Sequence, residues 1–151
     1  DDFWLHMNAW SLSQFLHGEQ GALLVASQLC SCAPTFNAKL YAASQTFDEA
    51  RHVEVFNKYL QQRIGMMYPI NTHLKSIIDK ILTDERWDMK FIGMQIVIEG
   101  LALSAFVARC WRREAYLSPS MRAVRWTPYC WAKSAAWAQN SRGRRLRVVC
   151  C

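Results

Sequence analysis

The residues best suited to metal chemistry lie in two short segments. Glu49 and His52 stand three positions apart, and Glu99 stands alone in a long apolar run. Residues three apart on a helix project from one face, so this carboxylate and imidazole can bind one metal ion, with the carboxylate free to bridge to a second. A lone Glu-x-x-His pair is common by chance, so it does not establish a metal site by itself.

Two further carboxylates strengthen the metal interpretation. Every neighbour of Glu99 is apolar, which predicts a helix buried on all sides. An ionised carboxylate there needs a cation or hydrogen-bond donors, and the alternatives are a paired or a protonated Glu99. Glu19 falls on an apolar helix face near Phe15, with a partly exposed carboxylate as the alternative. One Glu from each of two helices and a Glu-x-x-His from a third form most of a two-metal site in a helical bundle.

The helices that must position these residues follow from apolar residues at three- and four-residue steps. The first is predicted over about residues 2–29 and the second over about residues 37–63, with Gly65 as its C-terminal stop. Gly18 and Gly21 are poor helix formers, and such small residues permit a second helix to approach closely.

Two more helices follow. Asn71 is expected to cap a short helix that ends near Leu82. Thr83 or Asp84 is expected to open the next helix, which continues to about Ala108. No two-residue alternation persists in these segments, and no Gly-rich phosphate loop occurs. The predicted class is therefore all-α, in the form of a helical bundle.

The composition changes abruptly along the chain. Residues 1–106 carry 8 Lys and Arg against 11 Asp and Glu, whereas residues 107–151 carry 10 against 1, together with four of the seven Trp and four of the six Cys. We expect the second segment to be an atypical basic tail, irregular or partly helical, and we hypothesise that it is the product of a shifted reading frame. The alternative is a basic arm that binds nucleic acid, although such arms are rarely this rich in Trp and Cys.

The first residues of the chain and its longest apolar run indicate where in the cell the protein is expected. The chain begins at Asp1, which is typical of a fragment or a processed product, and its first residues do not resemble a signal peptide. The longest apolar run, residues 91–106, falls short of the roughly 20 residues that a membrane span needs. We therefore expect a cytoplasmic protein without a membrane anchor.

Three segments resemble a known family: FLHGEQGAL at 15–23, FDEARHVEVFNKY at 47–59 and MQIVIEGLAL at 94–103. They are similar to bacterial ferritin-like di-iron carboxylate oxygenases, the relatives of the ribonucleotide reductase small subunit and the arylamine N-oxygenases. The resemblance covers about residues 4–106.

The resemblance implies a site and an activity. Glu19, Glu49, His52 and Glu99 would bind two iron ions, or one iron and one manganese, with Glu49 and Glu99 as bridging or flexible carboxylates. The implied chemistry is that of an oxidoreductase that activates O₂ and oxidises a small organic substrate, with an electron donor that the sequence does not identify.

Two departures from the family pattern matter. The ribonucleotide reductase subunit typically carries its radical Tyr four residues after this His, where Phe56 stands here, so an oxygenase or oxidase is favoured. The second Glu-x-x-His is missing, because no histidine follows His73. The bundle therefore lacks its last metal-ligand helix and offers four of six expected ligands, so we expect impaired activity.

Two other functions remain open at this stage. The first is a non-enzymatic helical interaction module that forms a homodimer, and the second is a ferritin-like protein for iron storage.

The residues around the metal ligands can also be predicted. A metal-bound His commonly donates its other ring N–H to a carboxylate. Asp48, Asp84 and Asp88 are the candidates for that second contact.

Overall fold

The computed structural model describes residues 2–105, which form helices and short connections with no strand among them. The predicted all-α class is confirmed for this part of the chain. The chain divides into two units, Asp1–Phe106 and Val107–Cys151, and the described residues belong to the first. The predictions made for residues 107–151 lie outside the described residues.

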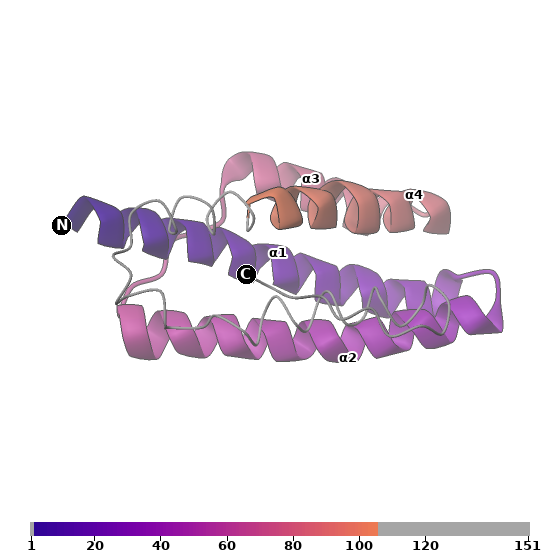
Figure 1. Ribbon diagram of the computed structural model, residues 1–151. Helices are drawn as coiled ribbons and strands as arrows, with labels where there is room; N and C mark the ends of the chain where they lie inside the picture. Colours follow the sequence, from indigo (N-terminus) through magenta and orange to yellow (C-terminus); the bar gives the residue numbers. More distant parts are fainter. Residues whose placement is uncertain (1, 106–151) are drawn as a thin grey trace. The chain divides into compact units, whose positions relative to one another are not determined.

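The two longest helices form an antiparallel pair (Figure 1). Helix α1 spans Asp2–Cys32 and α2 spans Phe36–Tyr59. Thr35 caps α2, since its hydroxyl accepts a hydrogen bond from the Ala38 N–H at 3.2 Å. The helix continues as a π-helix, η1, over Leu60–Ile64. Gly65 ends it in the left-handed conformation with φ of 75°, so the predicted stop is confirmed.

The third helix, α3, spans Thr72–Thr83. Asn71 caps it as predicted, because its side chain accepts a hydrogen bond from the His73 N–H at 2.9 Å. The expectation that Thr83 or Asp84 opens the next helix was wrong. Asp84 instead ends α3 in an extended conformation, and its carboxylate accepts a hydrogen bond from the Arg86 N–H at 2.8 Å. This local bond favours a turn, which delays the next helix.

The last described helix is continuous but changes its winding. It begins as α4 over Trp87–Phe91, becomes the π-helix η2 over Ile92–Ile98, and returns to α-helix over residues 99–105. It runs in the same direction as α2 and opposite to α1 (Figure 1). Helix α1 contacts α2, α3, α4 and both π-helices, so it is the central element of the described unit.

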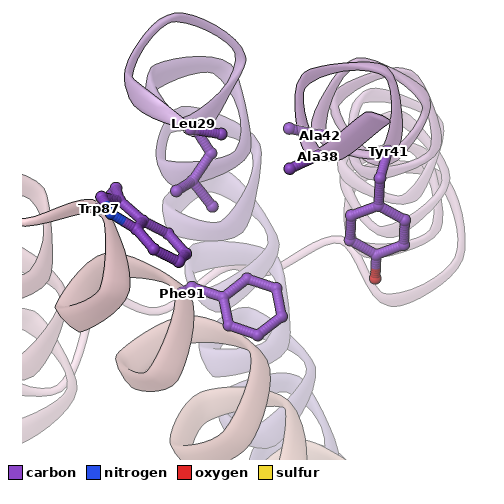
Figure 2. Close-up of a pocket in the computed structure, with 7 residues that line it drawn as sticks. Leu29, Ala38, Tyr41, Ala42, Trp87 and Phe91 are labelled. Carbon is purple, nitrogen blue, oxygen red and sulfur yellow. The ribbon is translucent and has the colours of Figure 1, made fainter. Parts of the chain in front are cut away.

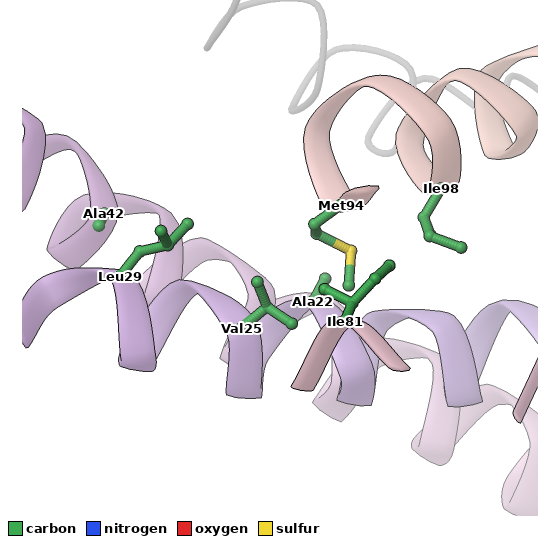
Figure 3. Packing of buried hydrophobic residues seen from close by; sticks show 7 residues of the cluster. All are labelled: Ala22, Val25, Leu29, Ala42, Ile81, Met94 and Ile98. Carbon is green, nitrogen blue, oxygen red and sulfur yellow. The ribbon is translucent and has the colours of Figure 1, made fainter. Parts of the chain in front are cut away.

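The main apolar core forms where α1 meets its neighbours. Figure 3 shows its buried side chains, which come from α1, α2, α3 and η2. They are Ala22, Val25, Leu29, Ala42, Ile81, Met94 and Ile98. A second buried group, towards the start of α1 and the end of α2, consists of Leu12, Leu16, Phe56 and Leu60. Along α1, the residues of the second group precede Glu19 and the residues of the main core follow it, so apolar surface is buried both before and after Glu19.

Close approach between helices depends on one of the two glycines predicted to permit it. A Cβ atom on Gly21 would lie 2.9 Å from Cγ2 of Ile78, in α3, whereas a Cβ on Gly18 would meet nothing within 4 Å. The prediction is therefore confirmed for Gly21 and wrong for Gly18. Of the helices in residues 2–105, none combines the length and the hydropathy required to cross a bilayer.

Candidate metal centre

Two helices bring three of the sequence-predicted ligands together. Glu19 comes from the middle of α1, and Glu49 and His52 come from successive turns of α2. One ligand atom from each residue lies within 4.8 Å of the other two. The i, i+3 spacing aims Glu49 and His52 at one point, and the antiparallel packing of α1 on α2 adds Glu19.

This group lies in an apolar interior. Glu19 and Glu49 are each only 4% exposed, and the side chain of His52 is 12% exposed. The main core adjoins it on one side. On the other, the rings of Phe15 and Phe56 stack with their centroids 6.1 Å apart. Bulk water therefore has little access to the carboxylates, and their electrostatic interactions are strengthened.

In the metal-free protein, His52 is the counter-ion of both carboxylates. Its Nδ1 atom lies 2.9 Å from Oε2 of Glu49 and 3.4 Å from Oε2 of Glu19. Burial is the largest single influence and lowers the pKa of His52, but the hydrogen bonds and charges of Glu19 and Glu49 together outweigh it and raise the pKa to about 9. The imidazole is therefore protonated at neutral pH, and its Nδ1–H donates to Glu49 while the imidazolium forms an ion pair with Glu19.

Gln45 is a contact residue that the sequence analysis missed. Its Nε2 atom lies 3.4 Å from Oε1 of Glu49, one turn further along α2. The i, i+4 spacing of Gln45 and Glu49 on one helix face could have revealed it. By donating to one oxygen of Glu49, the amide orients the carboxylate so that the other oxygen faces His52.

Glu99, the fourth predicted ligand, lies outside the group of three and is half-buried. The prediction that its helix is buried on all sides was wrong, since Ile96 is 62% and Leu101 59% exposed. Apolar sequence alone does not bury a helix face, which needs an element packed against it. Among residues 2–105 no helix covers this face.

The charge of Glu99 nevertheless acts on a residue of α2. Burial, followed by the charges of Glu49 and Glu99, raises the pKa of Tyr41 on α2. Both carboxylates therefore act on one phenol. The π-helix η2 ends at Ile98, directly before Glu99. The wider turns of this π-helix therefore determine the direction in which the Glu99 side chain projects from the helix axis. Such π-helical insertions are frequent at functional sites.

The three aspartates predicted to contact His52 have other partners. Asp48 pairs with Arg51 at 3.1 Å on the surface, and Asp88 pairs with Arg86 at 2.6 Å. Asp84 accepts from the backbone of Arg86. That one of these aspartates accepts a hydrogen bond from His52 when the site holds a metal stays a prediction.

The other histidines do not belong to the cluster. His17 contacts the backbone oxygen of Tyr68 at 3.0 Å and the Gln20 side chain at 3.1 Å. His6 contacts the Tyr68 hydroxyl at 2.5 Å, and His73 is exposed near the start of α3.

The donor set fits one divalent transition-metal ion. Two carboxylates and one neutral imidazole supply oxygen and nitrogen ligands, which suit iron and manganese. Two negative charges balance a divalent cation, so the occupied site is electrically neutral in its apolar surroundings. Glu99 does not belong to this donor set. No second Glu-x-x-His occurs in the sequence.

Comparison of the chain with known proteins adds no assignment. No family model matches it, and no curated protein or solved structure is significantly similar to it. The class of site is thus defined by its own residues: a carboxylate–histidine cluster between antiparallel helices of an all-α unit.

Proposed function

We propose that this chain is a ferritin-like metalloprotein that binds iron, alone or with manganese, and uses O₂ to oxidise a small organic substrate. The observation that carries the proposal is the convergence of Glu19, Glu49 and His52 within 4.8 Å. Unpaired buried charges are strongly unfavourable, so acidic clusters in an apolar interior are typical of metal sites. The resemblance of residues 15–23, 47–59 and 94–103 to di-iron oxygenases supports the same class.

Each residue has a distinct task in this proposal. Glu19 and His52 would hold the first ion, and Glu49 would serve as a ligand to both ions. Glu99 would bind the second ion. This assignment is supported by the pKa of Tyr41, which the charges of Glu49 and Glu99 both raise. When bound, ferrous ions supply the electrons with which O₂ is reduced during substrate oxidation.

The surrounding residues prepare the site for that chemistry. Phe15 and Phe56 exclude water from one side, and Gln45 holds the orientation of Glu49. Because position 56 carries a phenyl ring, it offers no phenol for a stored radical. The centre therefore suits oxidation of a bound substrate more than long-lived storage of an oxidising equivalent in the protein.

The test begins with Fe(II) binding under anaerobic conditions, measured by calorimetry and by iron analysis after desalting. We expect the wild-type chain to bind one ion firmly and a second more weakly, because four of the six family ligands are present. Glu49→Gln and His52→Gln should each weaken binding by at least about tenfold.

Glu54→Gln is the matched control, since Glu54 lies on the same helix and pairs with Lys58 on the surface. It should leave Fe(II) binding unchanged. Exposure of the loaded protein to O₂ should oxidise the iron, as followed by absorption and Mössbauer spectra. Absence of Fe(II) binding, or equal losses in Glu49→Gln and Glu54→Gln, would contradict the proposal.

A second candidate function, a helical interaction module, is favoured by one observation. Large apolar side chains are exposed along the last described helix, including Ile92, Ile96, Val97, Leu101 and Leu103. Such surfaces mark interaction sites. Sedimentation of the metal-free chain tests this: a well-folded dimer that takes up no iron would support this candidate against the first.

A further inference from the structure

A small apolar pocket lies between α1, α2 and α4, roughly two helical turns before Glu49 along α2. Its volume is about 180 Å³. Figure 2 shows the rings of Trp87 and Phe91 on one side and Ala38, Ala42 and Tyr41 on the other. An apolar cavity of roughly 150 Å³ stays dry and binds benzene, so this pocket has the capacity for one ring with a small substituent.

Two matching stripes of side chains lead from this pocket towards the carboxylates. Along α2, Tyr41 is followed at four-residue steps by Gln45 and Glu49, and along the last helix Phe91 is followed at the same steps by Gln95 and Glu99. Residues at this spacing share one helix face. The two helices run in the same direction (Figure 1), so each stripe presents an aromatic ring, then an amide, then a carboxylate.

The two amides are incompletely bonded in the described part of the chain. The Oε1 atom of Gln45 and the Nε2 atom of Gln95 are buried there without a hydrogen-bond partner. Gln45 gives its NH₂ group to Glu49, which leaves its carbonyl oxygen as an acceptor, and Gln95 offers a donor. Buried polar groups are normally bonded, so each such group requires an explanation.

A hydroxyl group has the bonding capacity that the two amides lack, because one oxygen can donate to Gln45 and accept from Gln95. We propose that the pocket binds a single aromatic ring bearing a hydroxyl group, with the ring between Phe91 and Ala42 and the hydroxyl directed towards the two amides. The hydroxyl of the ligand then lies about one helical turn, and its ring about two helical turns, short of Glu49 and Glu99. The identification of this phenol-type ligand as the molecule that is oxidised rests on the proposed function.

The test uses two fluorinated probes and the full metal-free chain, so that its outcome is independent of iron binding. Titrations of 4-fluorophenol and of 4-fluorotoluene are followed by ¹⁹F NMR. We expect 4-fluorophenol to bind at least about tenfold more tightly, because only it can bond the amides. This comparison on the wild-type protein depends on no variant.

A pair of variants locates the binding. Ala38→Leu fills the pocket and should reduce 4-fluorophenol binding at least about tenfold, whereas Ala43→Leu, on the exposed side of the same helix, should not alter it. Circular dichroism checks that both variants fold. Three outcomes would each overturn the inference. They are equal binding of the two probes, equal effects of the two variants, and no binding because another segment or a second copy occupies the pocket. Probe binding without iron uptake would leave the pocket intact and refute only the proposed function.

Discussion

The Nδ1 atom of His52 lies 3.4 Å from the carboxylate of Glu19, although the two residues belong to different helices. The shorter contact, at 2.9 Å to Glu49, follows from local helical spacing, but the contact with Glu19 needs the packing of α1 on α2. In the metal-free protein the protonated imidazole occupies the place that a cation would take. Metal binding and the protonation of His52 are therefore competing events.

Metal binding should release a proton. Because the pKa of His52 is raised to about 9, the imidazole is charged at pH 7 and must lose its proton to become a ligand. Calorimetric titration with Mn(II) in two buffers of different ionisation enthalpy should give about one proton released per ion at pH 7. His52→Gln should abolish this release, and no release from the wild type would contradict the assignment of His52 as a ligand.

The stability of the metal-free protein should fall as the pH rises from about 6.5 to 9. The pKa of His52 is raised on folding, so its contribution is fully present below its unfolded pKa of roughly 6.5 and is lost as the pH passes through about 9. Thermal melts in the presence of EDTA measure the change. In His52→Gln this decline should be reduced, and an identical decline in both proteins would exclude His52 as its source.

The pKa of Tyr41 should report the charge on Glu99. Burial and the charges of Glu49 and Glu99 raise this pKa, so Glu99→Gln should lower it by removing one of the causes. Titration of ¹³Cζ-labelled tyrosine by NMR measures the shift. Glu85→Gln, at an exposed position before α4, is the control. An unchanged pKa in Glu99→Gln would mean that Glu99 faces away from the centre.

Gln45 should affect metal affinity without being a ligand. Gln45→Leu removes the hydrogen bond to Oε1 of Glu49, and loss of such a contact typically weakens metal binding by about 10–100-fold. Gln61→Leu is the matched control, since Gln61 bonds only to Asn57 on the surface. Equal Mn(II) affinities for the wild type and Gln45→Leu would show that the amide does not position Glu49.

Substitution of two glycines on α1 should have opposite effects on stability. A Cβ atom on Gly21 would come within 2.9 Å of Ile78, so Gly21→Ala should destabilise the fold by about 1–3 kcal/mol through overpacking. Gly18 has open space around it, so Gly18→Ala should stabilise the helix by about 0.5–1 kcal/mol. Urea denaturation measures both changes, and a shift of the same sign in both variants would contradict the packing of α3 on α1.

Local features of the fold could be predicted from the sequence because they depend on neighbouring residues. The Asn71 cap and the Gly65 stop each involve backbone groups within a few positions. The convergence of Glu49 and His52 is of the same kind, since one turn of helix fixes it. The start of the last helix was misplaced because an Asp side chain can either cap a helix or bond a turn, and Asp84 bonds the turn at Arg86.

The tertiary structure alone decided which helix faces meet. It brought Glu19 to His52, placed Gly21 rather than Gly18 against α3, and left the apolar residues beside Glu99 exposed. Helical periodicity marks an apolar face but does not say what covers it, because burial depends on contacts between segments far apart in the sequence. The sequence by itself therefore determined the ligand types and their local spacing, and only packing decided which of them share one site.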